Sequence, residues 1–565
     1  MFQQDLQPVG DSLALSALCG ALPLLALFLL LGGLKLKAWV AGLISLGVAL
    51  LVAVLLFEMP VGQALLAGTE GAAFGFFPIL WIVINAIWVY NLTVASGHFD
   101  VLRRSFEKVS PDQRVQAIII AFCFGALLEA LAGFGTPVAI TVVMLMALGF
   151  EPIKAAVVAL VANTAPVAFG ALATPIVTLG TVTAGASDDP RLDTETLGAM
   201  VGRQTPLLAI VVPLILVFIV DGRRGLKHTW LPAIVCGFAF AVAQFVASNY
   251  ISVPLTDIIA SLVAAGAVVL LLRAWSPAEV LTAEPSTAPA KASSSARPGS
   301  GGGTTTVTGD PAAPRDDSRA DVARAYAPYL VIIAIFSIMN ITAVKELFAK
   351  EPFTTIFAWP GLDVLNVDGD PVATTNFTLN WLPAAGTLMI LAGIITAVIL
   401  RVGPGEALRT YGKTYVEPRS AIVTVMAVLA LAYVMNLSGQ TGSLGAWLAG
   451  AGAAFAILSP ILGWLGVAVT GSDTSANALF GALQVQTASS AGLDPVLMAG
   501  ANSSGGVLGK MVSPQNLAIA AAAVGLAGKE GDIFRKVIGW SLLLLALMCV
   551  IVWLQSTPVL DWMVP

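Results

Sequence analysis

Apolar stretches of about 20 residues recur along most of this chain, and short polar segments separate them. A stretch of that length is enough for one α-helix to cross the hydrocarbon core of a bilayer. The expected spans lie near residues 12–32, 38–57, 73–96, 205–220, 231–247, 254–272, 325–343, 382–400, 421–437 and 534–555. The pattern predicts an all-α polytopic membrane protein, with about 12 transmembrane helices plus two re-entrant hairpins in two inverted repeats.

Two further apolar regions, 115–181 and 444–527, are interrupted by glycine, proline and polar residues. Non-helical backbone at membrane depth is tolerated only where protein or a water-filled cavity surrounds it. We therefore expect the functional site at these interruptions.

Residues 274–321 form a Pro, Ser, Thr, Ala and Gly-rich tract that has no apolar face to bury. Such a composition is typical of a disordered linker, and this one divides the chain roughly in half. It follows a connecting helix pair that we place at 223–273.

Lys and Arg residues in short loops indicate which face is cytoplasmic. One set of loops carries most of them, including Lys35, Lys37, Arg103, Arg104, Lys108, Arg114, Arg223, Arg224, Lys227, Arg409, Lys413, Arg419, Arg535 and Lys536. The alternate loops at 58–72, 248–253, 438–443 and 491–495 have neither residue type. These alternate loops and both chain termini are predicted to be external, in a multi-pass protein of the cell membrane.

The same rule makes residues 115–150 a hairpin entered from the cytoplasmic face, and 444–490 a hairpin entered from outside. Broken spans follow them at 153–181 and 496–527. The first inverted repeat is thus predicted to cover 1–222, and the second to cover 322–565.

Short sequence blocks support this duplication. ANTAPVAFGALATP at 162–175 matches ANSSGGVLGKMVSP at 501–514 without a gap, and GFGTP at 133–137 matches GSDTS at 471–475. The blocks occur in the same order in both halves, as weak internal repeats of transporters do.

A helix that ends in mid-membrane presents free N–H groups with about half a positive charge, and small residues let an anion approach them. We therefore expect four helix ends to form a carboxylate site near the membrane midplane, at the interface of the halves. The candidate substrate-binding residues are Gly133, Gly135, Thr136, Asn163, Thr164, Gly471, Ser472, Thr474, Asn502, Ser503 and Lys510. The alternative is that these small residues serve close helix packing.

Three ionisable residues lie at these interruptions, where each costs about 2.5–3.5 kcal/mol at a helix centre. Glu129 and Asp473 are the candidate proton carriers, and Asp473 is preferred because it lies within a hairpin tip. Lys510 either pairs with a carboxyl or anchors the substrate carboxylate. The alternative is that the acids and Lys510 only neutralise one another.

The GFGTP, ANTAPVAFGALATPI, TGSDTSANALFGALQ and ANSSGGVLGKMVSPQN blocks resemble those of the bacterial lactate permease family, over most of the chain outside the linker. The resemblance implies a proton-coupled symporter for L-lactate, D-lactate and glycolate in the bacterial cytoplasmic membrane, without enzymatic activity. Through a wider ion-transporter superfamily it also implies paired re-entrant hairpins and an elevator-like movement. The resemblance is compatible with a homo-oligomer.

The composition of the chain excludes several other classes of function. Hydrophobic residues make up 57% of the chain and charged residues 11%, with only 2 histidines and 4 cysteines, none of them in a metal-ligand pattern. No cofactor, metal or nucleic acid is expected, and nothing indicates a catalytic set or a nucleotide-driven pump. A sodium-coupled carboxylate transporter and an anion uniporter or channel remain alternatives.

Overall fold

The computed structural model describes residues 1–133, 135–187, 189–281 and 317–565. Each of the ten predicted spans is helical, with 205–220 and 231–247 forming the two arms of one helix that bends at 221–229, so the expected all-α polytopic membrane architecture is confirmed. Among the described residues, ten helices are long and apolar enough to cross a membrane, or eleven with the bent pair at 152–183. The count of about 12 stays a prediction.

The helices before the linker are α1 (Leu13–Phe28), α2 (Ala38–Leu55), α3 (Val61–Phe74), α4 (Trp81–Ala95), α5 (His98–Glu107), α6 (Gln113–Gln116), α7 (Gly125–Leu131), α8 (Thr136–Ala147), α9 (Pro152–Ala162), α10 (Gly170–Thr183), α11 (Thr194–Val201), α12 (Thr205–Val246) and α13 (Thr256–Ala274). Those after it are α14 (Arg319–Met339), α15 (Thr342–Phe348), α16 (Ala385–Ile399), α17 (Pro404–Val416), α18 (Arg419–Leu437), α19 (Gln440–Leu448), α20 (Phe455–Thr470), α21 (Asp473–Ala491), α22 (Pro495–Gly509), α23 (Pro514–Ala523) and α24 (Glu530–Gln555). Four short strands pair in two small sheets, β1 (Phe2–Gln3) with β3 (Val364–Leu365) and β2 (Thr355–Ala358) with β4 (Asn376–Leu379).

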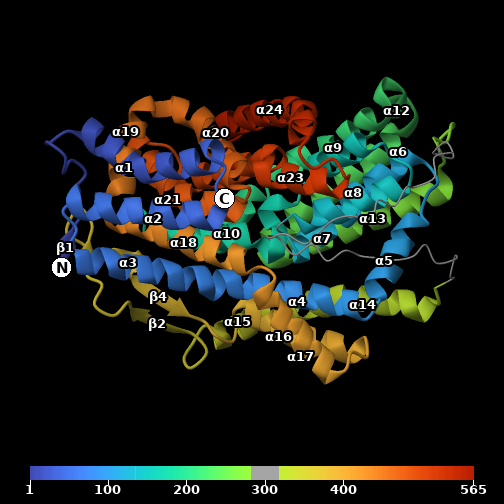
Figure 1. Cartoon of the computed structure of the whole chain (residues 1–565), viewed down its shortest axis with the longest axis horizontal. Coiled ribbons are helices and arrows are strands. Elements are labelled where there is room, and N and C mark those ends of the chain that lie inside the picture. Colours follow the sequence, from blue (N-terminus) through green and yellow to red (C-terminus); the bar gives the residue numbers. More distant parts are fainter. Residues whose placement is uncertain (134, 188, 282–316) are drawn as a thin grey trace.

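Most helices run along the long axis of the molecule (Figure 1). The N-terminus and strands β1, β2 and β4 lie at one end, on the left of the view. Helices α5 and α6 and the bend of α12 lie toward the other. The sequence predicts the first group outside and the second in the cytoplasm, and this orientation stays a prediction.

The segment 58–72 was expected to be an external loop, and that prediction is wrong. Residues 61–74 form α3, which continues through a bend at Phe77 into α4. Thr69, Glu70 and several glycines lower the apolarity of this segment, which hid it from a hydropathy pattern. The glycines serve close packing instead, because a Cβ on Gly71 would lie 2.6 Å from the carbonyl oxygen of Leu429 in α18.

Both predicted hairpins have two helical legs and a break. In the first, a continuous helical segment over 113–131 is followed by α8, with residues 132–135 between them. In the second, α20 and α21 are separated only by residues 471–472, and the first leg starts at Phe455 because the backbone bends at Gly452.

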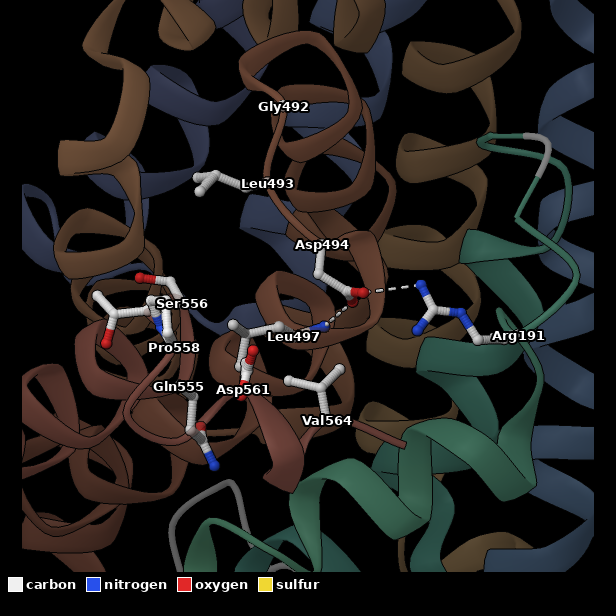
Figure 2. Close-up of a pocket in the computed structure, with 11 residues that line it drawn as sticks. Arg191, Gly492, Leu493, Asp494, Leu497, Gln555, Ser556, Pro558, Asp561 and Val564 are labelled. Carbon is white, nitrogen blue, oxygen red and sulfur yellow. Dashed lines mark hydrogen bonds and ion pairs between the residues drawn. The ribbon is translucent and has the colours of Figure 1, made fainter.

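The turns of the two hairpins lie at opposite ends of the bundle. After the first turn, the ammonium of Lys154 donates to the carbonyl oxygen of Val220, at the end of the first arm of α12 (3.0 Å). At the second turn, Asp494 binds Arg191 at 2.7 Å (Figure 2), in the loop between α10 and α11 that precedes the start of α12. This is the geometry that inverted hairpins would have.

The linker predicted at 274–321 lies largely outside the described residues, which stop at 281 and resume at 317. Its described edges are held against the bundle. The amide of Leu281 donates to the carboxylate of Asp112 (3.1 Å), and Arg104 forms two hydrogen bonds with Asp317 at 2.7 and 2.9 Å.

Candidate functional site

A buried ion pair joins the two halves of the chain. Lys510 Nζ donates to Glu129 Oε1 at 2.5 Å, and their side chains are only 8% and 3% exposed. The other carboxylate oxygen, Oε2, accepts from the Asn163 side-chain amide at 3.0 Å. Three of the candidate residues, each from a different interrupted segment, therefore meet at one carboxylate.

Local chain geometry explains how these groups meet. Glu129 lies on α7, one turn before the break that follows at residue 132, and Asn163 is the C-cap that follows α9, where the first broken span bends by 65°. Lys510 is the first residue of a 3-10 turn, Lys510–Val512, that separates α22 from α23. All three side chains sit at or beside helix ends inside the bundle, where the charges of the pair are shielded from lipid.

The two hairpin tips have the backbone conformation that glycine permits. Gly133 and Gly135 have φ values of 48° and 83°, and α8 begins directly after them at Thr136. Gly471 has a φ of 75°, and α21 begins two residues later at Asp473. Each tip therefore places a helix N-terminus inside the bundle, as expected from the sequence.

The tips converge on the second broken span. A Cβ on Gly135 would lie 2.3 Å from Ile519 Cδ1, and one on Gly471 would lie 2.7 Å from Gln515 Oε1, both in α23. Asn477 of the second hairpin also donates to the carbonyl oxygen of Pro175 in the first broken span, at 3.1 Å. The predicted meeting of hairpins and broken spans is thus present as direct packing.

Asp473 makes no ion pair among the described residues. Its Oδ2 accepts from the Ser503 hydroxyl at 2.6 Å and from the Asn477 amide at 3.4 Å, whereas Oδ1 is buried without a partner. Ser503 thus lies at the site, as expected, but as a donor to Asp473.

The expected helix end at 502–504 is a wrong prediction. These residues lie inside α22, which continues to Gly509, and the break comes eight residues later, at Lys510. Helix α22 continues through 502–504 because the glycines on the side that faces α20 allow the two helices to pack closely. A Cβ on Gly505 would lie 2.1 Å from the carbonyl oxygen of Pro460.

Asn502 consequently has a different role from Asn163. Its amide donates to Asn477 Oδ1 at 2.9 Å, and its Oδ1 accepts from the Gln484 amide at 3.0 Å. Both ends of this side chain are occupied within the protein, whereas Oδ1 of Asn163 is buried without a partner. Of the two aligned asparagines, only the first has an atom free to bind a ligand.

Other candidate residues form hydrogen bonds with the protein's own backbone or are buried in a helix. The Thr164 hydroxyl donates to the carbonyl oxygen of Val161 (2.7 Å), and the Ser472 hydroxyl accepts from the amide of Ser475 (3.3 Å) as the cap of α21. Thr474 is buried in the first turn of α21.

Comparison with known proteins identifies the family. A model of the L-lactate permease family matches residues 16–559. The chain belongs to this family. The L-lactate permease of Escherichia coli (strain K12) is 41% identical over 585 residues, covering 100% of both chains, and the glycolate permease GlcA of the same strain is 41% identical over 563 residues, covering 98% of both. Among solved structures, the YdaH transporter of Alcanivorax borkumensis covers 86% of both chains at 15% identity, with a TM-score of 0.43.

The resemblance of the four sequence blocks is therefore confirmed, and this permease is a multi-pass membrane protein. Two fully buried acids that form no ion pair among the described residues were missed from the sequence. Glu70 on α3 has no hydrogen-bond partner for either oxygen among the described residues, and Asp257 lies in the first turn of α13. The sequence could have singled out Asp257, because it is an acid inside the predicted span 254–272. Glu70 could not be recognised in this way, because its segment was interpreted as a loop.

Proposed function

We propose that this permease is a proton-coupled symporter of L-lactate and related 2-hydroxy monocarboxylates, namely D-lactate and glycolate. It would act in the bacterial cytoplasmic membrane, with both termini outside and with inverted repeats over 1–222 and 322–565. Relatives at about 41% identity are named for L-lactate and for glycolate, which supports this substrate class. Both are small monocarboxylates, so one cation at the site suffices for recognition.

The observation that carries the proposal is the shared cation of the Lys510–Glu129 pair. A substrate carboxylate that binds Lys510 removes the counter-charge of Glu129. A buried carboxylate without a counter-charge is costly, and the group then takes up a proton instead. Substrate binding thus raises the proton affinity of Glu129, and protonation of Glu129 in turn frees Lys510 for the substrate.

Charge balance favours this coupling. Moving a monovalent anion into a cell that is negative inside is opposed by about 2.3 kcal/mol per 100 mV. One lactate on Lys510 together with one proton on Glu129 adds no net charge to the moving protein, so the membrane potential does not oppose the loaded state.

The geometry favours Glu129 over Asp473 as the carrier, which reverses the preference drawn from the sequence. Glu129 shares a cation with the incoming anion, whereas Asp473 is bound by the Ser503 hydroxyl and by Asn477. The unpartnered oxygens of Asp473 and Asn163 can instead accept a hydrogen bond from the hydroxyl of a 2-hydroxy acid.

The test is uptake of labelled L-lactate into proteoliposomes, with pH and sodium gradients imposed separately. An inward proton gradient alone should drive accumulation. If only a sodium gradient drives it, the permease is sodium-coupled, and if neither does, it is a uniporter or channel.

A further inference from the structure

One face of helix α22 connects the cation of the site with its second buried acid. Ser503, Gly506 and Lys510 follow one another at spacings of three and four residues, so they lie in a row along the same face. The Ser503 hydroxyl donates to Asp473 Oδ2 at 2.6 Å, and a Cβ on Gly506 would lie 2.3 Å from Asp473 Oδ1. The carboxylate of Asp473 therefore lies across Ser503 and Gly506, and Oδ1 is the oxygen nearer to Lys510 along the helix.

The spacing between Gly506 and Lys510 suits a small hydroxy acid. Four residues of an α-helix rise by about 6 Å, and Cα–Cβ bonds tilt toward the helix N-terminus, so the side chain of Lys510 leaves the backbone toward the turn of Gly506. Asp473 and Lys510 are also within electrostatic range of each other. A carboxylate and a hydroxyl on adjacent carbon atoms can therefore reach Lys510 and Asp473 Oδ1 together.

Glycines flank the polar atoms at both ends of this arrangement. A Cβ on Gly170, in the first broken span, would lie 2.9 Å from Glu129 Oε1, and one on Gly133, at the first hairpin tip, would lie 3.8 Å from it. At the other end, Gly506 faces Asp473 Oδ1. Because glycine lets a ligand approach the backbone closely, these positions suit a small acid that takes the place of Glu129 on Lys510.

Asp473 Oδ1 needs a hydrogen-bond donor that the described residues do not supply. The side chain is buried, and Oδ1 has no partner among them, because Ser503 and Asn477 both donate to Oδ2. Asp473 is also the first residue of α21, where the helix dipole stabilises a negative charge. A buried carboxylate oxygen without a donor is costly, so a ligand hydroxyl that donates to it is bound with a large gain.

We propose that Asp473 selects the substrate by accepting a hydrogen bond from its 2-hydroxyl group at Oδ1, while Lys510 binds the carboxylate. The inference rests on the proposed function and adds the residue that separates 2-hydroxy acids from other small monocarboxylates. A 2-oxo acid such as pyruvate presents only an acceptor at this position, which the carboxylate oxygen repels. An unsubstituted acid such as propionate presents no polar group and leaves Oδ1 unpaired. Ser503 is a positioning residue, because it binds Oδ2.

The test compares three acids of similar size, L-lactate, pyruvate and propionate, as unlabelled competitors of labelled L-lactate in counterflow with proteoliposomes. Counterflow needs no pH gradient, so it reports selectivity whether or not transport is coupled to protons. The wild type should prefer L-lactate over either analogue by about 10- to 100-fold, the factor expected for a hydrogen bond to a charged group.

Asp473→Asn exchanges an acceptor for a donor at the decisive position. The amide oxygen should take the place of Oδ2, where Ser503 and Asn477 donate, so the NH₂ group takes the place of Oδ1. Pyruvate should then compete about tenfold better relative to propionate, because its oxo group can accept from the amide. Lactate keeps a partner, since its hydroxyl can also accept. Asp473→Ala should instead bring lactate and pyruvate to within about twofold of propionate.

Asp257→Asn is the matched control for these variants. Asp257 is also fully buried with one unpartnered oxygen, but it lies on α13 and not on the second hairpin. Its variant should leave the order of the three acids unchanged. Ser503→Ala should shift selectivity in the direction of Asp473→Ala but by a smaller factor, because Asn477 still donates to Oδ2.

Unchanged ratios among the three acids in both Asp473 variants would overturn the inference and leave the proposed function intact. If Asp473→Asn keeps the ratios but loses pH-driven uptake, the residue is the proton carrier and not the selector. An equal loss of all three acids would show a structural role instead. Wild-type uptake that ignores a pH gradient would refute the proton coupling, whereas a preference for L-lactate that depends on Asp473 would still stand.

Discussion

Replacing Glu129 with Gln should tighten lactate binding, although it removes a residue of the site. In the empty permease the ammonium of Lys510 is held by Glu129 at 2.5 Å, and the substrate carboxylate must displace it. In Glu129→Gln the ammonium has no competing carboxylate. Lys510→Ala should have the opposite effect, because it removes the cation that the substrate needs.

The size of the effect follows from the strength of a charged hydrogen bond, about 1.5–3 kcal/mol net in proteins. At about 1.4 kcal/mol per tenfold, Glu129→Gln should bind lactate about 10- to 100-fold more tightly at neutral pH, and Lys510→Ala should bind it more weakly by a similar factor. Breaking a buried pair also costs about 3–5 kcal/mol of folding stability. Bound lactate should return part of that stability to Glu129→Gln, since its carboxylate replaces the lost counter-charge.

The pH dependence of the affinity for lactate provides a second test. Because a proton and lactate bind together, wild-type affinity should fall as pH rises, whereas the affinity of Glu129→Gln should be nearly independent of pH. Titration of the purified protein with labelled L-lactate at acidic and neutral pH measures both quantities, and thermal melting with and without lactate measures the stabilisation.

Glu70→Gln is the matched control for these measurements. Glu70 is another fully buried carboxyl, but no described residue forms an ion pair with it, and it lies on α3, away from Lys510. Its variant should bind lactate as wild type does. Weaker binding in both Glu129→Gln and Lys510→Ala would refute the competition and leave a pair that only neutralises itself.

Three further predictions concern the rest of the site and the topology. Asn163→Ala should weaken lactate binding by about 1–3 kcal/mol, whereas Asn502→Ala should instead lower the melting temperature, because it leaves its two amide partners unsatisfied. Single cysteines at Glu151 and Asp494, in a cysteine-free background, should react with an impermeant thiol reagent in intact cells only at 494; labelling of both turns would contradict the inverted hairpins. Gly505→Ala should destabilise the protein by about 1–3 kcal/mol in thermal melting, since its Cβ would lie 2.1 Å from a facing carbonyl oxygen.

The predictable part of the fold was the part governed by hydropathy and by local breaks. Ten apolar runs became helices, and the glycines of both hairpin tips, Gly133 and Gly471, have the positive φ that breaks a helix inside the membrane. The segment 61–74 could not be read in this way, because Gly68 and Gly71 pack against α18, a helix more than 300 residues away in the sequence.

The sequence could predict which residues belong to the candidate site, but not which of them contact one another. Sequence spacing singled out Glu129, Lys510 and Asp473, but it could not show which acid holds the cation, because that depends on how two distant halves pack. It also placed a helix end at Asn502. The helix there is held by tight packing between α20 and α22, a tertiary effect that a repeat of small residues does not reveal.

That asymmetry between the halves bears on mechanism. Two identical broken spans would bring two equal sites, whereas here the first supplies the unpartnered Oδ1 of Asn163 and the second supplies Lys510, the cation that Glu129 holds. Because the described part of the site has a single cation, an anion and Glu129 cannot both use it while Glu129 is charged. The exclusion makes either partner's binding depend on the other, since protonating Glu129 is what releases Lys510. In the proposed mechanism, a permease with a second, independent cation for the substrate would bind lactate well and yet lose the link to the proton, so the single shared charge is what would couple the two.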